Sequence, residues 1–112
     1  MENRRSVPRV PVSIEAMVME GKRAHGARTI DLSVAGACIE TDEGFREGTM
    51  LQMYIGPVEH ALPKALSLPG MVMWSKPEGS RHRSGMLFTE VDDRKLQLLS
   101  HMLYMLRPDG RE

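Results

Sequence analysis

Alternating apolar residues between Val10 and Val18 are the feature that most limits how this chain can fold. An apolar residue occupies every second position of this segment, and polar residues such as Ser13 and Glu15 stand between them. A period of two places the apolar side chains on one face of an extended chain. The segment is therefore predicted to be a half-buried β-strand.

Further strand-like segments follow at short spacing, separated by glycine, proline and acidic residues. They are His25 to Asp31 after a hairpin at Gly21-Lys22, Gly36 to Thr41, Met50 to Ile55, Ala65 to Leu68 continued by Met71 to Trp74, and His82 to Glu90. Pro69-Gly70 is interpreted as a bulge that bends the sheet, and Lys76 to Ser80 as a hairpin turn. Closely spaced strands with turns between them predict an antiparallel sheet of six to seven strands curled into a barrel.

The apolar period changes after Asp92-Asp93, either of which could cap a helix. Leucines then recur at helical spacing, and further apolar residues widen the stripe. The stripe consists of Leu96, Leu99, Leu103 and Leu106, with Leu98, Met102 and Met105 beside it. Pro108 and Gly110 end the pattern, so a helix over 92–107 is predicted to pack on the barrel.

The expected fold class is thus mainly β, with one C-terminal α-helix. A chain of 112 residues fits a single domain over 1–112. We expect 1–11 to form a flexible arm, 12–91 the barrel and 92–107 the helix. The formal net charge is +0, which gives no global basic field for bulk nucleic-acid or membrane binding. Cys38 is the only cysteine, which rules out an internal disulfide and suits a reducing compartment.

Three arginines, Arg4, Arg5 and Arg9, stand in the first nine residues. Pro8 and Pro11 prevent a helix there, so the guanidinium groups are expected on an extended, adaptable segment. Arginine suits a ligand with phosphates and purine rings, because its fork pairs with phosphate oxygens or a guanine edge and its flat face stacks. The alternative is that these are solvated arginines on a disordered terminus.

A second group, Asp31, Ser33 and Gly36, follows the second expected strand. A carboxylate can accept hydrogen bonds from guanine N1 and N2, a hydroxyl can bond to a base edge or phosphate, and glycine leaves room for a ligand. The alternative is an Asx or Ser turn closed by a glycine with positive φ. Both interpretations can hold together.

The pattern Arg5-x-x-x-Arg9 followed by Asp31-x-Ser33-x-x-Gly36 resembles the signature of the PilZ domain family of bacterial receptors for cyclic dimeric GMP. The strand end Val72-Met73-Trp74 and the segment Gly85-Met86-Leu87-Phe88 are similar to later landmarks of that family, in the same order. The likeness covers nearly the whole chain. It implies a PilZ-type barrel.

The resemblance implies that Arg4, Arg5, Arg9, Asp31, Ser33 and Gly36 bind cyclic di-GMP. Trp74 occupies a position near the bound base in relatives, and burial in the core is an equal alternative. An arginine in the place of Arg4 goes with two intercalated messenger molecules in relatives, so one or two ligands per chain are expected. A basic cluster at 81–83 is typical of a solvated hairpin end, with a phosphate contact as the alternative.

Other functions are less well supported. The histidines lack the spacing of a metal motif and Cys38 has no evident base, so we expect no enzyme, no metal and no cofactor. Single-stranded nucleic acid would require more aromatic residues than 4%. The main rival is a PilZ-fold interaction module that does not depend on the nucleotide, for example in pilus assembly or motility control.

The expected cellular compartment follows from the absence of long apolar stretches in the sequence. The N-terminal residues have no apolar stretch of the kind a secretion signal needs, and no run approaches the ~20 apolar residues of a membrane span. We therefore expect a cytoplasmic protein without membrane insertion. It would signal by ordering its arm and act on a downstream protein that the sequence does not identify.

Overall fold

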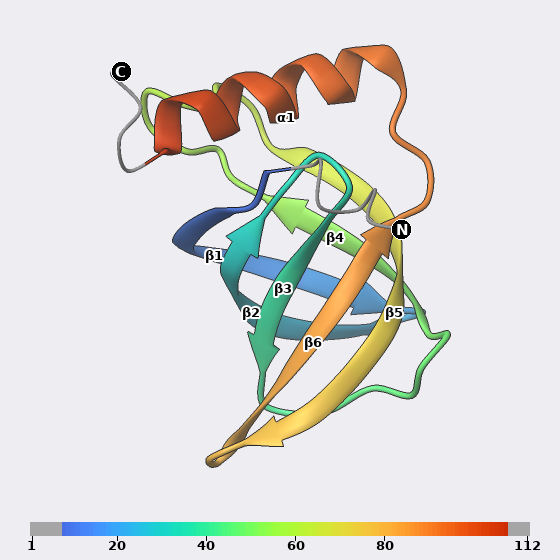
Figure 1. Cartoon of the computed structure of the whole chain (residues 1–112). Coiled ribbons are helices and arrows are strands. Elements are labelled where there is room, and N and C mark those ends of the chain that lie inside the picture. The colour runs from blue at the N-terminus through green and yellow to red at the C-terminus, as the bar shows by residue number, and fades with distance from the viewer. Residues whose placement is uncertain (1–7, 108–112) are drawn as a thin grey trace.

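A closed antiparallel barrel of six strands forms the body of the molecule in the computed structural model, which describes residues 8–107 (Figure 1). The elements are β1 (Val10–Glu20), β2 (Arg23–Leu32), β3 (Gly36–Thr41), β4 (Met50–Ile55), β5 (Leu66–Glu78), β6 (Arg81–Phe88) and α1 (Asp93–Leu106). Around the barrel the strands follow the order β1-β2-β3-β6-β5-β4, and β4 pairs again with β1. The expected fold class is confirmed, with six strands.

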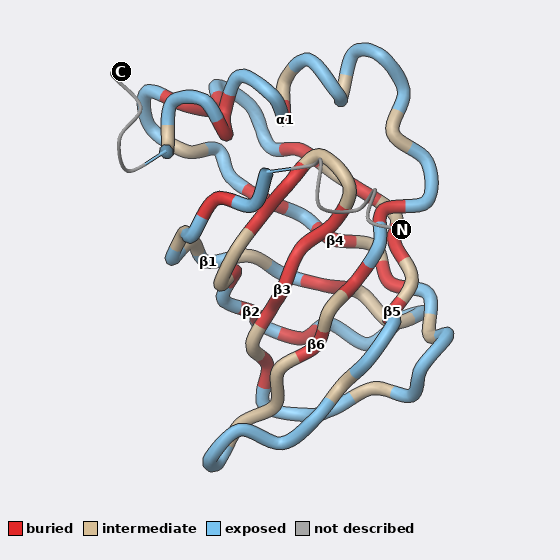
Figure 2. The backbone as a smooth tube through the Cα atoms, in the orientation of Figure 1, coloured by how far each residue is buried: buried red, intermediate tan, exposed pale blue. Residues whose placement is uncertain are grey.

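The alternation of β1 places its apolar side chains toward the barrel interior. Val10 and Val18 are buried, while Ser13, Glu15 and Met17 between them are exposed. Figure 2 shows buried and exposed positions alternating along the strands. The strand begins at Val10, two residues inside the segment 1–11 that the sequence suggested as an arm. Arg9 therefore stands directly before the first strand.

The helix α1 lies across one end of the barrel (Figure 1). Asp92 caps it, because its Oδ1 accepts a hydrogen bond from the backbone N–H of Lys95 at 2.9 Å. Leu99, Met102 and Leu103 are buried and join the barrel core. The apolar stripe is narrower than predicted, since Leu96 is 38% and Met105 is 47% exposed.

The predicted bulge at Pro69-Gly70 is wrong. Both residues pair regularly with β4, opposite Gln52 and Leu51. The carbonyl oxygen of Pro69 faces Thr89, just after β6 ends, and the nitrogen of a residue points to the same side as its oxygen. The missing N–H of Pro69 therefore lies on the side of Thr89, beyond the last residue of β6, and the ladder with β4 loses no hydrogen bond, so the strand can continue through it. The hairpin turn is also shorter than predicted, because β5 extends to Glu78.

Candidate functional site

A straight row of four residues crosses the outer face of the barrel. Asp31 on β2 lies opposite Cys38 on β3, and Cys38 lies opposite Gly85 on β6. Gly85 in turn lies opposite Trp74 on β5. We call these four residues the outer row. The sequence motifs at 31–36 and 72–88 are thus brought together by strand pairing.

A shift in strand register precedes the residue at each end of the outer row. The β2–β3 register shifts between Thr29 and Asp31, and the β5–β6 register shifts between Val72 and Trp74. A bulge inserts one residue and turns the following side chain. Asp31 and Trp74 each follow such a shift, so the local backbone sets the direction of both side chains.

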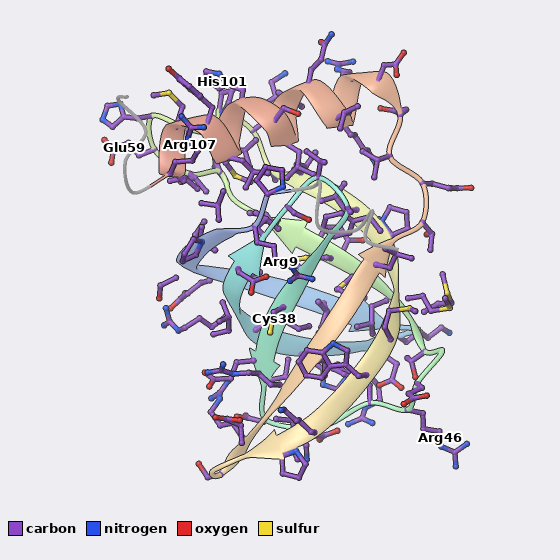
Figure 3. All side chains as sticks on the ribbon, viewed as in Figure 1. Arg9, Cys38, Arg46, Glu59, His101 and Arg107 are labelled. Carbon is purple, nitrogen blue, oxygen red and sulfur yellow. The ribbon has the colours of Figure 1, made fainter. Side chains whose placement is uncertain are left out.

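Arg9 contacts the outer row at Asp31. Its Nη1 donates to Asp31 Oδ1 at 2.8 Å. The side chain of Arg9 is 66% exposed and that of Asp31 is 27% exposed, so the contact is open to solvent. Figure 3 shows Arg9 on the same side of the barrel as Cys38. The structure therefore brings the end of the N-terminal segment to the carboxylate, so the last arginine of the first motif contacts the second motif.

Ser33 and Gly36 form the turn between β2 and β3. The Ser33 hydroxyl accepts hydrogen bonds from the backbone N–H groups of Ala35 and Gly36 at 3.1 and 3.2 Å, and Ser33 is buried. Gly36 does not have a positive φ, so that part of the alternative interpretation is wrong. Its lack of a side chain has a packing reason: a Cβ there would overlap the carbonyl oxygen of Met86 on β6.

Trp74 lies on the surface, and the core interpretation of this residue is wrong. The residue is 39% exposed, and its ring covers Gly85. A Cβ at position 85 would lie 2.6 Å from Trp74 Cε2, so the ring can occupy this position only because residue 85 has no side chain. Lys76 Nζ stands 5.7 Å from the centre of the ring. The indole is therefore an accessible flat surface with a cation next to it.

A second row runs parallel to the outer row and carries charge. Arg28, Glu40, Arg83 and Lys76 lie opposite one another across β2, β3, β6 and β5. Arg83 Nε is buried and has no hydrogen-bond partner among the described residues. Arg81 has ion-pair partners, because it lies 3.0 Å from Asp42 and 3.5 Å from Glu40. Arg81 and Arg83 thus each have a buried Nε without a hydrogen-bond partner among the described residues, and of the two only Arg81 lies within ion-pair distance of described carboxylates.

Sequence reasoning missed Arg83, Lys76, Gly85 and Cys38 as neighbours of the motif residues. Lys76, Arg83 and Gly85 stand 45 to 54 positions from Asp31 in the sequence, and Cys38 lies on the following strand. The strand register places them, and register between distant strands has no local signal in the sequence. Arg4 and Arg5 lie outside the described residues.

Cys38 is buried within the outer row. Burial raises the pKa of its thiol, and the carboxylate of Asp31 acts in the same direction, while Arg83 and Arg9 oppose them. The folded state thus favours the protonated thiol. The contribution of the Cys38 thiol to the stability of the folded state is fully present below the pKa of the unfolded thiol. It is lost as the pH rises through the higher pKa of the folded thiol.

Alkylation of Cys38 should therefore be slow at neutral pH and should accelerate only at higher pH than in the unfolded chain. The measurement is the rate of reaction with iodoacetamide between about pH 7 and pH 10, a range that spans the ordinary thiol pKa. The control is the same series in denaturant. Equal rates for folded and unfolded protein at every pH would contradict the burial and the raised pKa.

The fold and its surface define a small binding module. The sequence model of the PilZ domain matches residues 3–105 of the chain. The chain therefore belongs to the PilZ domain family, whose members are regulatory or binding modules. Among curated proteins, none matches the chain.

Solved structures with the same fold include three PilZ proteins. The PilZ domain of YcgR from Escherichia coli with c-di-GMP has a TM-score of 0.75 and 14% identity, over 97% of this chain and 95% of that one. The inhibitor of motility MotI of Bacillus subtilis has a TM-score of 0.75 and 16% identity, over 92% of this chain and 51% of that one. The chain thus spans about half the length of the Bacillus protein.

The PilZ domain of CeSA from a cellulose-synthesising bacterium has a TM-score of 0.65 and 17% identity, over 88% of this chain and 97% of that one. At such identities these structures establish the common fold. Within residues 8–107, no helix has the length and apolar character needed to cross a membrane.

Proposed function

We propose that the protein is a non-catalytic receptor for cyclic di-GMP, which binds on the outer face of the barrel beside the outer row. The observation that carries the proposal is the contact of Arg9 with Asp31 at 2.8 Å. It joins the two parts of the motif, which are 22 positions apart. The E. coli domain of the same fold was solved with this ligand, which supports the proposal.

The Arg9–Asp31 contact leaves both groups capable of further binding. It uses one oxygen of Asp31 and one nitrogen of Arg9. A carboxylate has a second oxygen that can accept from guanine N1 or N2, and a guanidinium has five N–H donors. The exposed Trp74 ring offers a surface on which the base can stack. A guanine at the Asp31 end of the outer row can therefore meet a carboxylate and a guanidinium, and the indole at the other end offers a stacking surface.

The turn residues have an indirect role in this proposal. Ser33 is committed to backbone N–H groups and Gly36 to close packing against β6. Both hold the β2–β3 connection immediately after Asp31. Their contribution to binding is then chiefly to fix the position of the carboxylate, and a direct contact from Ser33 would require its hydroxyl to leave the turn.

The phosphates of the ligand require cations near the guanine site. Arg83 and Lys76 flank the outer row, and Arg83 has a buried donor without a partner among the described residues. Arg4 and Arg5 supply the remaining charge from the N-terminal segment. A second messenger molecule, stacked on the first and held by Arg4, is part of the proposal.

Signalling would follow from ordering the N-terminal segment. Fixing a backbone costs about 1–2 kcal/mol per residue, while each hydrogen bond to a charged group returns about 1.5–3 kcal/mol. Arginine contacts with phosphate can therefore fix residues 1–7 on the barrel surface. A downstream protein could then recognise the newly formed surface.

Calorimetric titration with cyclic di-GMP tests the receptor function. We expect saturable binding to the wild type and about tenfold or greater weakening in Arg5→Ala, because one charge-assisted contact is lost. Lys22→Ala, which changes a cation in the β1–β2 turn, is the control and should bind normally. If the wild type does not bind, or if Arg5→Ala binds equally well, the nucleotide-independent interaction module becomes the better interpretation.

A further inference from the structure

The outward side chains of β1, β4 and β5, with one residue of β6, form a surface without charged residues. Three adjoining rows make up this surface, which we call the methionine face. The rows are Met17-Tyr54-Ser67, Met19-Gln52-Pro69 and Met50-Met71-Leu87. In a chain with 27% charged residues, nine neighbouring outward positions without a charge are unusual.

Large apolar side chains on the methionine face are open to solvent. Met17 and Tyr54 are each 39% exposed, Leu87 is 44% exposed and Met50 is 53% exposed. Contiguous apolar patches of this kind on soluble proteins mark interaction sites. Methionine and tyrosine are enriched at the centre of protein interfaces, where charged residues are depleted. The composition is thus that of an interface centre.

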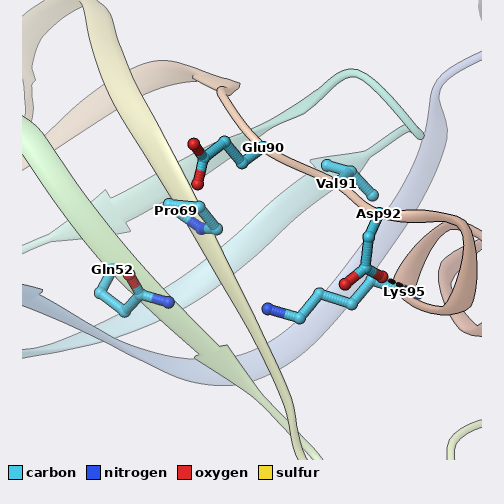
Figure 4. A pocket seen from close by; sticks show the side chains of 6 residues that line it. All are labelled: Gln52, Pro69, Glu90, Val91, Asp92 and Lys95. Atoms are coloured by element: carbon cyan, nitrogen blue, oxygen red, sulfur yellow. Dashed lines mark hydrogen bonds between the residues drawn. The ribbon is translucent and has the colours of Figure 1, made fainter.

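Two hollows open on this face and share its middle row. One, of about 440 Å³, is lined by residues that include Met19, Met50 and Tyr54. The other, of about 570 Å³, extends toward the start of α1 (Figure 4). Gln52 and Pro69 line both hollows, so the two hollows adjoin at these residues, and we call the two together the groove. None of the lining residues belongs to the outer row.

The α1 end of the groove carries both signs of charge. Glu90, Asp92 and Lys95 line it, and the Lys95 side chain extends toward Gln52 (Figure 4). Among residues 8–107, Lys95 makes no ion pair with a carboxylate. The rim thus holds two carboxylates and one ammonium group, so a strongly acidic partner would meet like charge there. In a two-fold symmetric dimer, the positive residue at this rim of one copy can face a negative residue at the same rim of the other copy.

We propose that a second copy of this chain docks on the methionine face to form a two-fold symmetric dimer. The Met and Tyr side chains pack at the centre, and Lys95 of each copy meets Glu90 of the other at the rim. A formal net charge of +0 removes the overall repulsion that would oppose association of identical chains. This proposal does not depend on ligand binding at the outer row.

Sedimentation velocity over about 1 μM to 1 mM protein, the affinity range of weak to moderate dimers, tests the proposal. The wild type is expected to dimerise, and Tyr54→Glu to weaken the dimer by about tenfold or more, because a charge would enter its centre. Tyr104→Glu is the matched control, since it changes the other tyrosine, 55% exposed on α1, and should dimerise normally. Circular dichroism confirms that each variant is folded.

A charge exchange tests the rim separately. Lys95→Glu and Glu90→Lys should each weaken self-association, because each places like charges opposite one another at both rims. An equimolar mixture of these two variants should recover dimers, because the mixed pair has opposite charges at both rims. Glu59→Lys, on a loop outside the methionine face, is the control for the change in net charge.

Three results would overturn the proposal. They are a monomeric wild type over the whole concentration range, a dimer that Tyr54→Glu leaves intact, and equal weakening by Tyr54→Glu and Tyr104→Glu. Failure of the mixed charge variants to recover dimers would overturn the two-fold arrangement. None of these results bears on cyclic di-GMP binding, which titration measures independently.

Discussion

Asp31→Ala is expected to weaken the binding of cyclic di-GMP by about a hundredfold, which corresponds to about 3 kcal/mol. The carboxylate is the acceptor for guanine N1 and N2 in the proposed site, and two hydrogen bonds to a charged group are lost together. Arg9 also loses its partner at 2.8 Å and with it the contact that holds the end of the N-terminal segment beside the outer row. Both effects lower the affinity.

Calorimetric titration of folded variants measures this loss. Asp42→Ala is the matched control, because Asp42 is an exposed aspartate paired with Arg81 and lies outside the outer row. Asp31→Asn should fall between the wild type and Asp31→Ala, since an amide keeps an acceptor oxygen without the charge. Stability should change by less than about 1 kcal/mol, because the Arg9–Asp31 pair is solvent-exposed. Normal affinity in Asp31→Ala would contradict the assignment of the site.

Gly36→Ala is expected to lower the free energy of unfolding by about 3 kcal/mol, at the upper end of the effect of overpacking. The added methyl group would overlap the carbonyl oxygen of Met86 and lie 3.3 Å from Leu87 Cα, so backbone has to move. The residue is buried at the start of β3, where that strand pairs with β6. Neither strand can retreat without breaking the barrel ladder.

Gly26→Ala provides the control for the glycine prediction. Gly26 lies on β2, has no heavy atom within 4 Å of an added Cβ and lacks a positive φ. Alanine there should be neutral or stabilise by about 0.5 kcal/mol, through the unfolded chain. Urea unfolding gives both values. Equal stability of Gly36→Ala and the wild type would show that β3 and β6 are not packed as described.

Local pattern predicted most of the fold. The alternation in β1 and the change to a helical period after Asp92 each reflect a regular geometry that neighbouring residues share. The bulge predicted at Pro69-Gly70 was wrong, because a proline is tolerated in a strand where its nitrogen points past the end of the neighbouring strand. That condition depends on where β6 ends and has no sign near Pro69.

The candidate site was predictable only in part. The motif residues Arg9, Asp31, Ser33 and Gly36 are recognisable by their spacing, and the structure brings Arg9 to Asp31. The different uses of Ser33 and Gly36, which maintain the turn and the packing of β3, were not predictable. Trp74 was assigned equally to core and site, and its exposure follows from the register shift before it.

Spacing along the chain was enough to predict which segments are strands, where the helix begins and which residues resemble the PilZ signature, because each of these is a local pattern. Tertiary structure alone decided that Asp31, Cys38, Gly85 and Trp74 form one row and that uncharged residues from separate strands gather on one face. The reason is that pairing between strands distant in sequence sets side-chain neighbours, and a shift of one residue would turn each side chain to the opposite face.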